Sequence, residues 1–261
     1  AVPAGAVTVE PIGHEREYSG DFFCSVVTKT TLAPTPNSDE ISRAYEEGWV
    51  GQRGYMNQQG QWQRRALAFI GDTHHQNGEV IPEVYLVDLP EDPNEFKIQG
   101  DEPLQGTEKT MPAPPKDVKQ RRLTYTHHRK FPGLAKQPRH WLRSSPNGES
   151  IACLMHDDHG IVQLWLVATA TGALTQVTFG KFSIQSAFSW NKTGEYLCFV
   201  YDNSVVRCHV ATGDLERLTQ RTEIAPVADA VVFSPNDKFV AFMRDINGFR
   251  QIYIVETGLS N

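Results

Sequence analysis

Residues 145–153, SPNGESIAC, decide the fold because the same pattern occurs three times along the chain. The other copies are NKTGEYLCF at 191–199 and SPNDKFVAF at 234–242. Each copy is a turn of Pro, Asn, Gly or Asp followed by a strand with apolar residues at alternate positions. Gly148 and Gly194 are 46 residues apart, and Gly194 and Asp237 are 43 apart. Propeller blades repeat at about 40–45 residues, so the spacing predicts a β-propeller.

A second marker keeps the same register. TGAL at 171–174 leads to Val177-Thr178, and TGDL at 212–215 leads to Leu218-Thr219. Strand pairs such as 163–167 and 251–255 lie between the two markers. The repeats predict antiparallel four-stranded blades at 139–178, 184–219 and 228–257. The aromatic residues expected to pack mainly between blades are Trp141, Trp165, Phe188, Trp190, Phe233 and Phe242.

The first part of the chain predicts one further blade, at about 18–126. Its expected strands are 21–28, 65–71, 83–89 and 120–125. The insertion 37–64 is expected to contain a short helix, because Asn37 and Glu40 have capping-box spacing and Ile41, Ala44 and Tyr45 form an apolar stripe. The second insertion, 90–118, is rich in proline and predicts a surface loop. Residues 1–261 are thus expected to form a single all-β propeller portion of about four blades.

Composition narrows the classes of partner. The formal charge of -6 argues against nucleic acid as the main partner. Apolar runs of the ~18 residues that a membrane helix needs do not occur, so no membrane partner is expected. The N-terminal residues do not have the layout of a signal peptide, which favours a cytoplasmic location, with the periplasm as the alternative.

The four cysteines show neither C-x-x-C nor zinc spacing. They are expected to be buried free thiols. The alternative for two of them, Cys198 and Cys208, is a disulfide across the hairpin that turns at 202–203.

Three motifs resemble the bacterial YidR family: SDEISRAYEEGWVG at 38–51, RRLTYTHHRKFPGLAKQPRHW at 121–141 and DDHGIVQLWL at 157–166. The family is a TolB-like propeller without an established activity, and its members are longer at the N-terminus by about three blades. More distantly, the repeats resemble those of the oligogalacturonide lyases. Those enzymes are seven-bladed propellers that hold a divalent metal with His and Gln at the central channel.

The resemblance bears on ring closure. The last blade has expected strands near 229–233, 238–244 and 250–256, and is therefore one strand short. Segment 6–10 would close a four-bladed ring if it paired with 250–256. The preferred hypothesis is that the chain is the C-terminal part of a seven-bladed ring, completed by an N-terminal segment of the same protein.

Charge gives the strongest functional signal. Residues 118–148 contain no Asp or Glu but eight Lys or Arg and three His. Such a field suits a carboxylate or phosphate ligand. The alternative is a solvated basic loop that pairs with acidic neighbours such as Asp157 and Asp158.

Position sharpens this hypothesis. Loops 126–140, 179–187 and 220–230 are expected to open at the mouth of the channel. His140 and Gln185 are candidate ligands for a divalent metal, manganese or calcium. Arg139 and His140 are candidates for charge stabiliser and base. The expected ligand-binding residues are His127, His128, Arg129, Arg139, Gln185 and Asp229.

Two functions follow from these residues. The first is a propeller that binds an anionic small molecule, glycan or protein partner at the channel mouth. The second is a metal-assisted lyase or hydrolase acting on acidic oligosaccharides. The fold alone does not choose between them, since propellers support both binding and catalysis.

Overall fold

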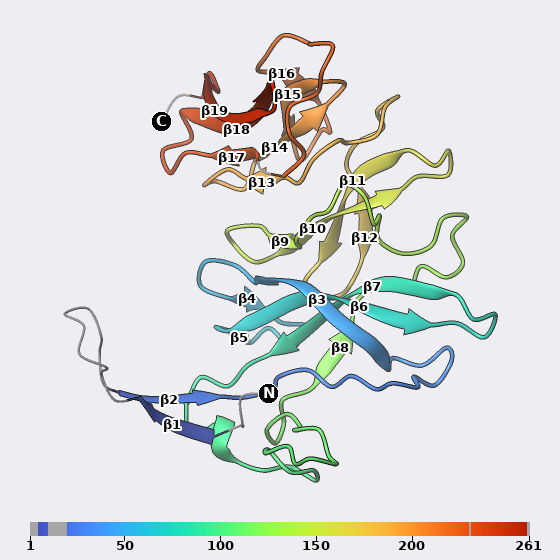
Figure 1. The fold of residues 1–261 in the computed structure, drawn as a ribbon, viewed down its shortest axis with the longest axis vertical. Helices are drawn as coiled ribbons and strands as arrows, with labels where there is room; N and C mark the ends of the chain where they lie inside the picture. The colour runs from blue at the N-terminus through green and yellow to red at the C-terminus, as the bar shows by residue number, and fades with distance from the viewer. Residues whose placement is uncertain (1–4, 10–19, 230, 260–261) are drawn as a thin grey trace.

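The computed structural model describes residues 5–9, 20–229 and 231–259, with side chains from residue 25 onward. Four antiparallel sheets follow one another in chain order, from β3 in the lower half of Figure 1 to β19 at the top. Within the described ranges the only helix is the 3₁₀ turn η1, Glu95–Lys97, and no helix has the length and apolar character to cross a lipid bilayer. The chain is an all-β propeller portion, as the repeats predicted.

Each of the four sheets is a meander with its innermost strand first in the chain. The first sheet contains β3 (Ile41–Trp49), β6 (Ala66–His74), β7 (Val80–Asp88) and β8 (Gln120–Arg122). The second contains β9 (Arg143–Ser144), β10 (Ser150–His156), β11 (Val162–Ala168) and β12 (Leu174–Gln176). The third contains β13 (Ser189–Trp190), β14 (Tyr196–Tyr201), β15 (Ser204–His209) and β16 (Leu215–Arg217). The fourth has three strands, β17 (Val231–Phe233), β18 (Phe239–Ile246) and β19 (Phe249–Glu256).

The helix expected within 37–64 is wrong, because this segment holds the innermost strand β3. Two register shifts interrupt the pairing of β3 with β6, one between Ile41 and Ala44 and the other between Tyr45 and Gly48. A bulge adds a residue to one strand, so apolar residues three apart can share a face of the sheet. The stripe that resembled a helix is therefore the signature of a bulged strand. Residues 55–63 also form a small hairpin, in which β4 (Tyr55–Met56) pairs with β5 (Trp62–Gln63).

The strand expected at 21–28 is also misplaced. Strand β2 (Gly20–Cys24) pairs with β1 (Gly5–Val9) and not with the first sheet. The same pairing contradicts the alternative that 6–10 closes a four-bladed ring against 250–256. Residue 10 lies outside the described residues.

Apolar side chains fill the spaces between successive sheets. One cluster joins the first and second sheets and includes Trp165. Another joins the second and third sheets and includes Phe188, and the last joins the third and fourth sheets and includes Phe233 and Phe242. Trp190 packs against the second cluster. The expected packing between blades is confirmed for these five aromatic residues, whereas Trp141 belongs to none of the clusters.

The recurring threonine after each outermost strand has a direct structural role. Its hydroxyl accepts a hydrogen bond from a backbone N–H near the start of the adjacent third strand. Thr178 accepts from Leu164 at 2.9 Å, and Thr219 accepts from Val205 at 3.0 Å. In the first sheet Thr124 accepts from the N–H of Val84 in the same way. The side chain thus replaces a ladder hydrogen bond where the outer strand leaves the sheet.

The two cysteines considered for a disulfide are free thiols. Cys198 lies opposite Arg207 in the β14–β15 ladder, and Cys208 lies opposite Leu197. Because neighbouring positions on a strand point to opposite faces, the two thiols lie on different faces of the sheet. Burial raises the pKa of Cys198 and Cys208 to about 12, so both stay protonated at neutral pH. The side chain of Cys24 lies outside the described residues.

Candidate functional site

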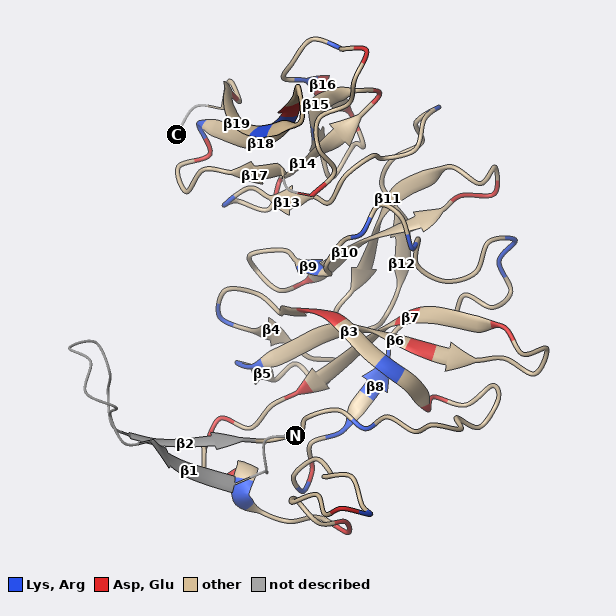
Figure 2. Ribbon diagram, viewed as in Figure 1, with Lys and Arg blue, Asp and Glu red and all other residues tan. Residues whose placement is uncertain are grey.

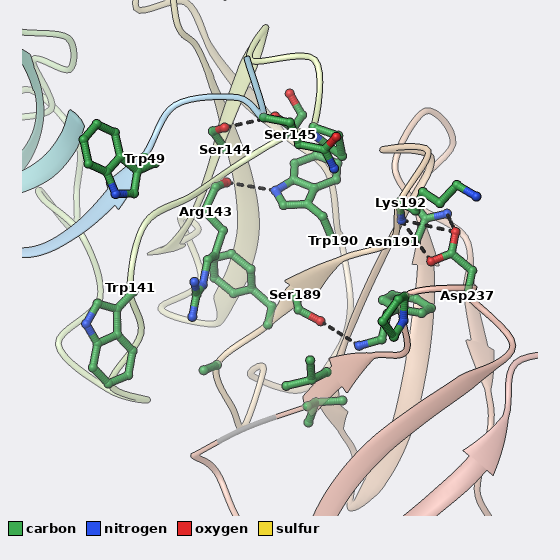
Figure 3. A pocket seen from close by; sticks show the side chains of 18 of the residues that line it. Trp49, Trp141, Arg143, Ser144, Ser145, Ser189, Trp190, Asn191, Lys192 and Asp237 are labelled. Carbon is green, nitrogen blue, oxygen red and sulfur yellow. Dashed lines mark hydrogen bonds between the residues drawn. The ribbon is translucent and has the colours of Figure 1, made fainter. Parts of the chain in front are cut away.

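A cavity of 1140 Å³ opens where the innermost strands of three sheets begin. Strands β9, β13 and β17 contribute its floor, and the end of β3 contributes one wall. These strands are the ones that face the axis in a propeller, so the cavity occupies the channel side of the sheets. Figure 3 shows that its side chains come from segments far apart in sequence.

Three tryptophans line this channel cavity. Trp49, at the end of β3, is 64% exposed. Trp190 is fixed by its indole N–H, which donates to the carbonyl oxygen of Arg143 at 2.8 Å. The ring of Trp141 lies 4.6 Å from the guanidinium carbon of Arg139. The cavity therefore offers broad, oriented aromatic surface, of the kind that binds the flat faces of ligands.

The acidic groups at the cavity are already paired. Asp229 accepts from Arg250 at 2.7 Å. Asp237 is buried and accepts from the side-chain amide of Asn191 at 3.1 Å and from the backbone N–H of Lys192 at 3.0 Å. Their negative charge is thus largely satisfied by the protein itself.

Two of the basic groups at the cavity have no charged or hydrogen-bonding partner among the described side chains. Arg139 donates to Glu46 at 2.8 Å. By contrast, the side chains of Arg143 and Lys192 have no ion-pair or hydrogen-bond partner in the part of the chain that the structure describes. Figure 3 shows the Arg143 side chain extending toward the side of the cavity where Trp141 lies, while the Trp190 ring lies beside the Arg143 backbone. The cavity therefore combines aromatic surface with uncompensated positive charge.

Of the residues selected from sequence, the cavity brings together Arg139 and Asp229. His140 does not join them. It is buried, its Nδ1 lies 3.0 Å from the carbonyl oxygen of Pro138, and its Nε2 accepts the N–H of Leu154 at 3.2 Å. Burial lowers the pKa of His140, which keeps the ring neutral.

The role of His140 is repeated in the next sheet by a residue of different type. There the hydroxyl of Ser186 accepts the N–H of Val200 at 2.7 Å, at the register position that His140 and Leu154 occupy. A histidine with both nitrogens bonded to backbone atoms has no free lone pair for a metal or a substrate proton. The structure thus uses His140 as a backbone partner.

Gln185 lies elsewhere, in the loop that precedes β13, and its side chain contacts the turn between β14 and β15. Its side-chain oxygen accepts the N–H of Asn203 at 2.8 Å, and its amide donates to the Asn203 side chain at 2.9 Å. The expected convergence of Arg139, His140 and Gln185 on one cavity is therefore wrong. Among the residues from 25 onward that are described, no three His, Cys, Asp or Glu side chains are grouped to hold a metal ion.

The remaining predicted residues lie at the outer start of loop 126–140. His127 stacks on His75 with ring centroids 5.9 Å apart. Arg129 donates to the carbonyl oxygen of His156 at 2.7 Å and lies 4.3 Å from the ring centroid of Trp165. His128 and Arg129 line a separate groove of 980 Å³ between the first two sheets.

Two arginines of the basic segment, Arg121 and Arg122, are paired with acidic side chains beside this outer groove. Figure 2 shows the basic strand β8 beside acidic positions of the same sheet. Arg122 pairs with buried Glu83 at 3.0 Å, and Arg121 lies 3.9 Å from Asp88. The alternative of a basic loop that pairs with protein acids therefore holds for this part of the segment, although the partners are not those expected.

Sequence reasoning missed Trp49, Arg143, Trp190 and Lys192. The available signal was their place in the repeat. Trp190 directly precedes the turn at 191–194, and Arg143 lies two residues before the turn at 145–148, both at the positions of the innermost strands. Trp49 was missed because its segment was predicted to be helical.

The succession of antiparallel meanders, three with four strands and the last with three, defines a β-propeller portion. A TolB structure from Agrobacterium tumefaciens aligns with a TM-score of 0.50 at 13% identity, over 92% of this chain and 66% of that one. An oligogalacturonate lyase in complex with manganese aligns with a TM-score of 0.42 at 13% identity, over 74% of this chain and 55% of that one. Identities this low concern the fold alone, and no family model matches the chain.

Sequence similarity is much closer to one curated protein. The chain is 51% identical over 257 residues, 98% of its length, to the uncharacterized protein YidR of Escherichia coli (strain K12). The chain is thus similar to a YidR protein over nearly its whole length, which confirms the resemblance that its motifs predicted. It spans 58% of the length of that relative.

Proposed function

We propose that the channel cavity binds an anionic sugar, with a pyranose ring against the exposed tryptophan surface and a carboxylate on Arg143. The observation that carries this proposal is the guanidinium of Arg143, which has no partner among the described residues and lines the same cavity as Trp49, Trp141 and Trp190. Arg is suited to a carboxylate because its planar fork donates two parallel hydrogen bonds. Lys192 adds a second positive charge at the same cavity.

The serine hydroxyl groups at the cavity are already hydrogen-bonded within the protein, so the cationic side chains are the main groups that can bind a ligand. Ser144 accepts from Gly51 and donates to the carbonyl oxygen of Ser145, while Ser189 accepts from the N–H of Phe233. The hydrogen-bond donors that stay available to a ligand are therefore mainly those of the positively charged side chains. A neutral sugar is expected to bind weakly, since it leaves those charges without a partner.

Binding is favoured over the lyase alternative by the state of His140. Proton abstraction requires a base at the cavity, and both nitrogens of this ring are bonded to backbone atoms. The proposal is accordingly a binding function at the channel cavity.

Replacing Arg143 with alanine is expected to weaken binding of trigalacturonate about 10- to 100-fold, the value of one charge-assisted contact. Isothermal titration calorimetry of the wild type and of Arg143→Ala measures this change. Arg64→Ala is the matched control, because Arg64 is an exposed arginine whose partner is Glu91. It should bind as the wild type does.

Two results would contradict the proposal. One is equal loss of affinity in Arg143→Ala and Arg64→Ala, which would indicate nonspecific attraction. The other is equal affinity for trigalacturonate and for the neutral galactose trimer, which would show that the cations do not contribute.

A further inference from the structure

Two cations of the outer groove are held in place by neutral backbone atoms. Arg129 donates to the carbonyl oxygen of His156 at 2.7 Å, and Lys130 donates to the carbonyl oxygen of Asp158 at 3.2 Å. In the described part of the chain neither cation has an ion-pair partner. Because a carbonyl oxygen has no net charge, these contacts fix the direction of the two side chains but leave their positive charge uncompensated.

Arg129 is the more tightly placed of the two. Its guanidinium carbon lies 4.3 Å from the ring centroid of Trp165, whose own indole N–H donates to the carbonyl oxygen of Met155 at 3.2 Å. The described residues accept from two of the guanidinium nitrogens, with the sulfur of Met155 as the second acceptor at 3.8 Å. A guanidinium has five N–H donors, so Arg129 keeps donors for a ligand. A partly buried arginine without a carboxylate partner is costly, which points to an anion from outside the chain.

The fold does not require this stacked pair. The recurring threonine contacts align Leu164 of the second sheet with Val205 of the third, so the equivalent of Trp165 is Val206. Val206 is buried and fills the space between the second and third sheets. An aliphatic side chain is thus enough to close the space between two blades. The cation on an aromatic ring is specific to the outer groove.

We propose that the outer groove binds a phosphate group through Arg129 and Lys130, at a site separate from the channel cavity. A phosphate monoester has a charge of about −1.5 to −2 at neutral pH and three acceptor oxygens, which suits two fixed cations better than a single carboxylate does. Arg can donate to two of these oxygens while Lys acts as a point charge. His128 lines the same groove, and among the described lining residues Asp158 is the only acid.

The test uses glucose 6-phosphate as the probe. We expect the indole N–H signal of Trp165 in a ¹H–¹⁵N spectrum to shift and saturate, because its ring contacts Arg129. Isothermal titration calorimetry should show binding weakened by about 10-fold or more in Arg129→Ala and by about 3- to 10-fold in Lys130→Ala. The matched control is Lys181→Ala, which changes an exposed lysine of the corresponding loop 179–187 and should leave binding unchanged.

The acidic residue of the groove gives a change of opposite sign. Asp158→Asn removes a carboxylate but keeps the backbone carbonyl that holds Lys130. Binding of glucose 6-phosphate should therefore become about 2- to 5-fold tighter. Asp158 and Lys130 are both exposed, so these two variants decide the matter if Arg129→Ala does not fold.

Titration with inorganic phosphate separates the two sources of such a ligand. Tighter binding of glucose 6-phosphate assigns the groove to a phosphorylated small molecule, whereas equal or tighter binding of inorganic phosphate assigns it to the free ion. Three results would overturn the proposal. They are an unmoved Trp165 signal with both probes, equal losses in Lys130→Ala and Lys181→Ala, and unchanged or weaker binding in Asp158→Asn.

Discussion

Glu83→Ala is expected to lower the free energy of unfolding by about 3–5 kcal/mol, the cost of breaking a buried ion pair. Glu83 is fully buried on β7 and accepts from Arg122, at 3.0 Å, and from the backbone N–H of Thr126, at 2.7 Å. It also accepts from the hydroxyl groups of Thr124 and Thr126. Removing the carboxylate leaves the Arg122 guanidinium, whose side chain is 6% exposed, without its buried partner.

Urea unfolding followed by circular dichroism measures this loss. Glu79→Ala is the matched control, because Glu79 is an exposed residue four positions earlier in the same segment, and its loss should stay within about 0.5 kcal/mol. Glu83→Gln should fall between the two variants, since Gln163 occupies the equivalent position of the second sheet with an amide. Equal stability of Glu83→Ala and Glu79→Ala would show that the buried network does not hold the first blade together.

Gly213→Ala is expected to cost about 2–5 kcal/mol of stability, from a strained backbone and a forced separation of two blades. Gly213 has a φ of +74°, and an added Cβ would lie 2.2 Å from the carbonyl oxygen of Val177 in the preceding blade. The same contact occurs one blade earlier, between Gly172 and Leu123. This close approach explains why a glycine follows threonine in both copies of the second marker.

Gly248→Ala separates the two contributions. Gly248 has a φ of +82°, but an added Cβ would meet nothing within 4 Å. Its loss should therefore be the backbone cost alone, about 1–2 kcal/mol. Thermal unfolding of both variants gives the comparison, and equal losses would mean that contact between blades contributes nothing at Gly213.

The later sheets were predictable because their signals are local. A turn at 145–148 or 191–194 needs particular residues, and the strand that follows alternates apolar and polar positions within a few residues. The two markers also report contacts that recur in each blade, such as the hydroxyl of Thr178 on the N–H of Leu164. A repeated contact leaves a repeated residue, which a single sequence reveals.

The first sheet was less predictable because its innermost strand is irregular. Glu46 on β3 has a φ of 53°, which breaks the alternation on which strand prediction depends. Bulges of this kind are determined by pairing with β6, more than twenty residues away in sequence. Local periodicity therefore favoured a helix at 41–45, whereas tertiary pairing produces a strand.

The sequence predicted the kind of side chains at the candidate site but not which residues would line it. The charge pattern located a basic segment, and Arg139 and Asp229 do line the channel cavity. The hydrogen-bond partner of His140 is the backbone N–H of Leu154, which the short ladder between β9 and β10 leaves without a strand partner. That ladder is a feature of the fold, and the local sequence does not reveal it. A sequence pattern records that a histidine is present but not that its nitrogens are already used.

The central claim is that the channel cavity binds an anionic sugar through its tryptophans and Arg143. The most direct measurement uses the five indole N–H signals of the chain in a ¹H–¹⁵N spectrum during titration with trigalacturonate. We expect the signals of Trp49, Trp141 and Trp190 to shift together and saturate, while those of Trp62 and Trp165 stay in place. A saturating shift of Trp165 alone would place the ligand at the outer groove beside Arg129 and contradict the account, as would the absence of any shift.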